Sequence, residues 1–125
     1  MSFVYVEVLI VVLFTIPKTY LKSLKIYEEL GDKRGIGDNY DNIGSIYHNQ
    51  DNYEKALEYY GKSLKIRKEI GDKQGIGVSS ANIGFIYKWQ GNYEKAVDYL
   101  LKSKNIKKEI NTIEDLDKTS EELSE

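Results

Sequence analysis

Apolar side chains recur every three or four positions along two neighbouring stretches of the chain, and a short polar segment separates the stretches. The first stretch carries Ile36, Tyr40, Ile43 and Tyr47, and the second begins at Tyr53. Steps of three and four residues place side chains on one face of an α-helix. The pattern therefore predicts two helices, over residues 36–50 and 53–70.

The residues at the ends of these stretches favour the same boundaries. Asn52 suits the N-cap position of the second helix, and Glu54 places negative charge in its first turn. Gly71 follows the last apolar residue, and glycine is the usual residue just past the C-terminal end of a helix. The predicted unit is a helix, a tight turn, a second helix and a longer turn.

The whole unit occurs a second time, 40 residues later and without a gap. Residues 31–70 and 71–110 agree at the positions that set the pattern, among them Asn42 and Asn82, Ile43 and Ile83, Gly44 and Gly84, Tyr47 and Tyr87, Ala56 and Ala96, and Ser63 and Ser103. A period of about 20 to 50 residues is typical of proteins that stack one structural unit on the next. The second copy predicts helices over 76–90 and 93–110.

Both flanks carry parts of the same unit. Residues 18–30 match the end of the first copy, which predicts the second helix of a degenerate repeat, beginning near Pro17 because proline is tolerated in a first helical turn. In residues 111–125 the register continues, since Leu116 and Leu123 fall 40 residues after Ile76 and Ile83. We expect a helix over 116–124 that opens a further repeat or caps the array.

Residues 1–17 form an apolar segment that does not match the repeat. The segment is shorter than the ~20 residues that span a bilayer, and Glu7 interrupts it. Three interpretations stay open: a cap that packs on the next helix, a membrane-facing or secretory remnant, and a stretch that does not fold natively.

The repeat resembles the tetratricopeptide repeat, in a 40-residue form where the usual length is about 34. The positions that carry the family pattern hold Tyr40, Ile43, Gly44, Tyr47, Ala56, Tyr60 and Ser63 in the first copy, and Ser80, Ile83, Gly84, Tyr87, Ala96, Leu100 and Ser103 in the second. The proline that usually follows the second helix is absent. Long repeats joined by GDK-x-G-x-G are similar to those of bacterial sensor proteins and kinesin-light-chain-like arrays. The resemblance implies an all-α solenoid of antiparallel helix pairs, with two complete repeats and a half-repeat at each end.

Composition narrows the possible chemistry. The chain has no cysteine and one histidine, which excludes disulfides, zinc–thiolate sites and multi-histidine metal sites. The net charge of -2 gives no basic surface for nucleic acid. His48 next to Asp41 or Asp51 is a weak general-base candidate, and Gly35-Ile36-Gly37 reads as a structural turn because it lacks the strand and lysine of a phosphate loop. We expect no enzyme activity, cofactor, metal or small-molecule substrate.

The family resemblance also implies where a partner binds. The first helices of successive repeats line a concave groove, and the groove positions here are Asp38, Asp41, Asn42, Ser45, His48, Asn49, Val78, Ala81, Asn82, Phe85, Lys88 and Trp89. In similar proteins the asparagine at Asn42 and Asn82 bonds the backbone of an extended peptide; its alternative role is to satisfy a neighbouring helix end. Phe85 and Trp89 form either an aromatic anchor or a cover for a further repeat. The lysine and arginine clamp of chaperone-binding members is absent.

These features together predict a protein-interaction scaffold that holds a peptide or helix of a partner protein. The alternative is a fragment of a membrane-attached bacterial signalling protein, whose array self-associates as a homo-oligomer through exposed half-repeats. We expect a cytoplasmic protein; the alternative is membrane association or export through residues 1–17.

Overall fold

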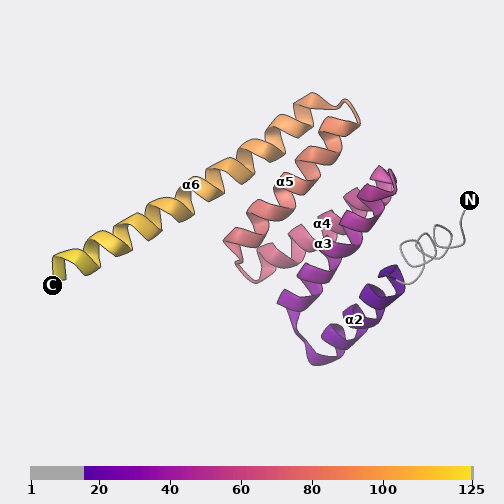
Figure 1. The fold of residues 1–125 in the computed structure, drawn as a ribbon, viewed down its shortest axis with the longest axis horizontal. Coiled ribbons are helices and arrows are strands. Elements are labelled where there is room, and N and C mark those ends of the chain that lie inside the picture. The colour runs from indigo at the N-terminus through magenta and orange to yellow at the C-terminus, as the bar shows by residue number, and fades with distance from the viewer. Residues whose placement is uncertain (1–15, 125) are drawn as a thin grey trace, which may run out of the picture.

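The computed structural model describes residues 16–124, and its regular structure there is entirely helical. The helices are α2 (Ile16–Leu30), α3 (Lys33–Asn49), α4 (Tyr53–Glu69), α5 (Lys73–Trp89) and α6 (Tyr93–Ser124). Each helix turns back along its predecessor, so the pairs α3/α4 and α5/α6 stack side by side (Figure 1). The predicted all-α solenoid of antiparallel helix pairs is therefore confirmed. None of the helices in residues 16–124 is long and apolar enough to cross a membrane. The three interpretations of the apolar N-terminal segment fall on residues 1–15, outside the described residues.

An acidic or amide side chain begins four of the helices, α3 to α6. Asn52 accepts a hydrogen bond from the backbone N–H of Lys55 at 3.2 Å, which confirms its predicted N-cap position. Asp72 accepts from the N–H of Gly75 at 3.0 Å, and Asp32 caps α3 in the same way. These aspartates start the first helix of each repeat three residues earlier than predicted.

The early start corrects the interpretation of the glycine pairs. Gly35-Ile36-Gly37 and Gly75-Ile76-Gly77 lie inside the first turns of α3 and α5, not in a turn between repeats. A Cβ at Gly35 would meet the ring of Tyr27, and one at Gly75 would meet the guanidinium of Arg67. Close contact with the preceding helix therefore requires these glycines, although glycine lowers helix propensity.

A left-handed residue ends each short helix. Gly71 has φ 68° just after α4, and the N–H of Asp72 then donates to the carbonyl of Arg67 at 2.9 Å. Asp51 takes the equivalent conformation after α3, with φ 58°. Glycine enters this region without steric cost, and aspartate tolerates it better than most residues.

No such residue interrupts α6. We predicted a helix that ends near Ile110 and a separate helix over 116–124, but α6 continues unbroken to Ser124 (Figure 1). Asn111-Thr112 replaces the Gly71-Asp72 pair of the preceding repeat, so the residue best suited to a left-handed turn is missing. The role of residues 111–125 as the start of a further repeat or as a cap stays a prediction.

Small residues at the helix crossings let aromatic side chains fill the core. Ala56, Tyr60, Ile83 and Ile86 form one buried cluster that joins the two complete repeats. A Cβ on Gly44 would lie 2.8 Å from the ring of Tyr60, so only glycine fits there without movement. This packing fixes α3 and α5 as neighbours and sets the surface that they present.

Candidate functional site

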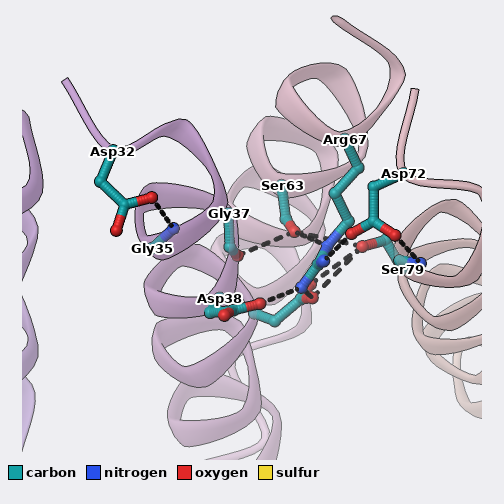
Figure 2. A network of polar contacts seen from close by, with 10 residues as sticks. Asp32, Gly35, Gly37, Asp38, Ser63, Arg67, Asp72 and Ser79 are labelled. Atoms are coloured by element: carbon teal, nitrogen blue, oxygen red, sulfur yellow. Dashed lines mark hydrogen bonds and ion pairs between the residues drawn. The ribbon is translucent and has the colours of Figure 1, made fainter. Parts of the chain in front are cut away.

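A buried arginine joins the two complete repeats. Arg67 on α4 is only 7% exposed. Its guanidinium donates to three carboxylates, those of Asp38 at 2.7 Å, Asp41 at 2.8 Å and Asp72 at 2.8 Å. Figure 2 shows these contacts converging between α3, α4 and α5. We call this network the polar seam.

Two serines complete the polar seam. Ser63 donates to the carbonyl of Gly37 at 2.9 Å and accepts a hydrogen bond from Arg67 Nε at 3.1 Å. Ser79 on α5 donates to Asp41 at 3.1 Å. Burial raises the pKa of Asp41 above its ordinary value, while the hydrogen bonds from Arg67 and Ser79 offset part of that rise. The seam therefore holds a desolvated charge cluster that is internally satisfied.

Three of the predicted groove residues make side-chain contacts within the chain, two of them in the polar seam. Asp41 is buried and bonded inside the seam, so it is not free to meet a partner. Asp38 keeps an exposed side chain, but its carboxylate is held by Arg67. The hydroxyl of Ser45 lies 2.9 Å from that of Tyr60. Our expectation that Asp41 lines the groove is wrong, because position 41 points toward α5 while its neighbour Asn42 is exposed.

Sequence reasoning did not identify the polar seam, although a comparison of the copies contains its signal. Arg67 is replaced 40 residues later by Lys107, and the same step replaces Asp41 by Ala81. The second copy therefore loses the carboxylate and exchanges the guanidinium for an ammonium group, which cannot bind several carboxylates in the same way.

The remaining predicted residues lie on α3 and α5 and are here together called the α3–α5 face. They are Asn42, His48, Asn49, Val78, Ala81, Asn82, Phe85, Lys88 and Trp89. Most of these side chains are exposed, and His48, Ala81 and Asn82 are half-buried. The ring of His48 lies 6.1 Å from that of Tyr53, centroid to centroid. The face offers amide groups and apolar side chains.

Two aromatic side chains dominate one end of the α3–α5 face. Phe85 is 45% exposed, and Trp89, one turn further along α5, is 65% exposed. Exposed neighbouring aromatics are common anchors in protein interfaces. Their alternative role as a cover for a further repeat stays open.

A groove of about 420 Å³ lies beside the other end of this face. Val78, Ala81 and Asn82 line its α5 side, and Ser103, Ile106 and Ile110 line its α6 side. Within residues 16–124, no cluster of three or more histidine, aspartate and glutamate side chains is arranged to hold a metal ion.

Stacked antiparallel helix pairs with small residues at their crossings define a helical-repeat protein. Models of the tetratricopeptide repeat match residues 18–69 and 78–111, which together make up more than half of the chain. The chain belongs to the tetratricopeptide-repeat family. Repeats of this family generally mediate protein–protein interactions, and its members are typically non-enzymatic scaffolds.

The fold also resembles that of a solved structure, the crystal structure of BtubC (BKLC) from P. vanneervenii. The match has a TM-score of 0.67 at 22% sequence identity. It covers 74% of this chain and 39% of that one, so the chain spans less than half the length of BtubC. At this identity the likeness shows the fold alone. No curated protein compared with the chain matches it.

Proposed function

We propose that the chain is a non-catalytic interaction scaffold that holds an extended peptide or a helix of a partner protein on the α3–α5 face. The observation that carries this proposal is the exposure of Phe85 and Trp89 beside the repeated asparagines. A short peptide segment binds well where an apolar anchor site lies next to side-chain amides that can hydrogen-bond the peptide backbone.

The chemistry of the face defines the partner that would fit. Asn42 and Asn82 occupy the same register on adjacent first helices, and their amides can both donate to and accept from a peptide backbone. Phe85 and Trp89 would receive an apolar or aromatic side chain. A terminal carboxylate is a poor ligand, because Arg67 is already occupied by three carboxylates.

A peptide selection tests this proposal directly. A random peptide library displayed on phage is selected against the full chain, and labelled copies of the enriched peptides are titrated by fluorescence polarisation. Asn82→Ala combined with Trp89→Ala should weaken binding at least tenfold while leaving the helical circular dichroism unchanged. Leu101→Ala, an equally exposed apolar position on α6, is the control and should bind like the native chain. Peptides that bind the double variant and the native chain equally would refute the assignment.

The only tryptophan gives an independent readout. Trp89 is the sole tryptophan of the chain, so its emission reports on this face alone. Binding of an apolar peptide side chain should shift that emission to shorter wavelength, because the indole loses contact with water. Self-association through the exposed half-repeats, the alternative expected from the sequence, stays a prediction. The cytoplasmic compartment stays a prediction.

A further inference from the structure

The groove between α5 and α6 is the second-repeat counterpart of the site that α5 itself fills in the first repeat. Its lining residues Gly77, Ser103 and Ile106 stand 40 positions after Gly37, Ser63 and Ile66, which lie where α3 and α4 receive α5. A Cβ at Gly77 would contact Ile106, as one at Gly37 would contact Ile66. Ser63 is fully buried beneath α5, whereas Ser103 is only half-buried. The groove therefore has the shape of a seam that lacks its next helix.

The end of α6 carries the apolar pattern of that missing helix. Leu116, Thr119 and Leu123 fall 40 positions after Ile76, Ser79 and Ile83, the residues by which α5 enters the polar seam and the core. On α6 these side chains lie in water, with Leu116 64% and Leu123 83% exposed. An apolar stripe at helical spacing with no packing partner gains free energy from burial.

The straight course of α6 prevents the stripe from reaching the groove of its own chain. Residues 111–124 continue along the axis of α6, away from α5 (Figure 1). We infer that two copies of the chain pair by exchanging this segment, each placing residues 112–124 in the α5/α6 groove of the other. The exchanged segment would be the occupant that completes the groove.

The register of the polar seam fixes the geometry of the pair. The hydroxyl oxygens of Ser63 and Ser79 lie 3.1 Å apart, and Gly71 stands midway between the two residues in the sequence. Forty positions later the equivalent residues are Ser103, Thr119 and Asn111, so the same register places Thr119 opposite Ser103 with Asn111 midway between them. Two straight α6 helices that cross antiparallel at Asn111 satisfy this register in both copies at once. The arrangement has the two-fold symmetry usual for homodimers.

Charge complementarity supports the antiparallel pairing. Residues 98–110 carry four lysines and two carboxylates, whereas residues 111–124 carry five carboxylates and one lysine. The crossing lays the acidic segment of each copy on the basic segment of the other. It also brings Asp115 near Lys107, because these residues occupy the positions of Gly75 and Arg67. A Cβ at Gly75 would overlap the Arg67 guanidinium, so the exposed side chain of Lys107 has to move aside to admit Asp115. A carboxylate thus faces the ammonium group at the point of closest approach.

The exchange covers Ala81, which lines the groove and stands at the position of the buried Asp41, but it leaves the asparagines of the α3–α5 face accessible, so it can be tested separately from the proposed function. Asn42 remains exposed although α5 is docked beside it. By the same register, Asn82 remains accessible when the exchanged segment is in place. A failure of peptide binding would therefore leave the exchange standing, and the reverse also holds.

Light scattering on the full chain provides the first test. The native chain, eluted from a sizing column over a wide dilution series, is expected at the mass of a dimer. Leu116→Asp combined with Leu123→Asp should halve the mass with the helical circular dichroism retained, because both side chains are already in water in the single chain. Lys118→Asp, a charge reversal at the position of the exposed Val78, is the control and should remain dimeric. A monomeric native chain, or a dimer that survives the double leucine change, would overturn the exchange.

Cysteine cross-linking tests the register and separates exchange from folding back. The chain has no cysteine, so Ser103→Cys and Thr119→Cys introduce the only thiols. When the two single variants are unfolded, mixed, refolded and mildly oxidised, a disulfide-linked pair is expected on a non-reducing gel. Ser103→Cys mixed with Lys118→Cys should give no such product. If the Ser103→Cys/Thr119→Cys double variant forms its disulfide within one chain, α6 folds back on itself and the inference is wrong.

Discussion

Replacing Arg67 by methionine should remove a large part of the stability of the chain. Methionine keeps most of the aliphatic volume between α3 and α5 but leaves the carboxylate of Asp41 buried without its cation. Removing one partner of a buried ion pair costs about 3–5 kcal/mol. The exposed pair with Asp38 adds less than ~1 kcal/mol, because solvent screens it. Asp72 keeps the N–H of Gly75 as a partner. We therefore expect Arg67→Met to cost about 3–5 kcal/mol of a total of roughly 5–15.

A second substitution separates the lost charge pair from lost packing. Asp41→Ala introduces the residue that the next repeat already carries at Ala81. Combined with Arg67→Met, it removes the uncompensated carboxylate, and apolar replacement of a whole buried pair is often close to neutral. The double variant should therefore recover more than half of the loss. Lys107→Met, at the equivalent exposed position, is the control and should change stability by less than ~0.5 kcal/mol.

Urea unfolding followed by far-ultraviolet circular dichroism measures these differences. The four proteins are compared at one protein concentration, so that any association contributes equally. The reasoning fails if Arg67→Met costs less than about 1 kcal/mol, since that loss would be typical of a surface pair. It also fails if the double variant is as unstable as Arg67→Met, because packing would then explain the whole effect.

Two further predictions concern glycine and pH. Gly44→Ala should lower the free energy of unfolding by about 1–3 kcal/mol, because its Cβ would lie 2.8 Å from the Tyr60 ring. Gly61→Ala, with nothing within 4 Å of its Cβ, should raise the free energy of unfolding by roughly 0.5–1 kcal/mol. Thermal unfolding measures the stability of both variants, and changes of the same sign would contradict the packing argument. The hydrogen bond from Gly75 and the ion pair with Arg67 hold the pKa of Asp72 below its ordinary value, so its contribution is present above about pH 4 and lost as pH falls through the folded pKa. In urea titrations, the stability of Asp72→Asn should therefore fall less steeply than that of the native chain below about pH 4. Parallel stability curves for the two proteins would show that the Asp72 carboxylate does not contribute to this pH dependence.

The fold could be predicted because its determinants repeat in the sequence. Residues that set the helix crossings, such as Gly44 and Ala56, recur at the same spacing, and each helix end carries its own local signal. Local signals misled only where a tertiary contact decides. Gly75 reads as a turn residue by propensity, yet it is helical because Arg67 packs against it. The continuation of α6 past Ile110 has a local cause instead, since no residue in a left-handed conformation ends the helix there.

The candidate site was harder to derive, because exposure depends on which side of a helix faces its neighbour. Adjacent residues on a helix point about 100° apart. Asn42 therefore faces solvent, while Asp41 next to it is buried against α5. The family resemblance placed both residues in the groove and did not distinguish the two directions. The partner of Asp41, Arg67, lies 26 residues away, so no local pattern connects them.

The uniqueness of the polar seam bears on how the chain reaches its native order. Neighbouring units this similar risk docking in the wrong sequence while the protein folds. Only α5, which brings Ser79, and only the α3/α4 pair, which brings Asp41 and Arg67, complete the charge cluster together. Any other neighbour would leave the buried carboxylate of Asp41 without the hydroxyl of Ser79. The ionic cluster thus specifies which helix pair docks on which, whereas the apolar core residues around it are common to both repeats.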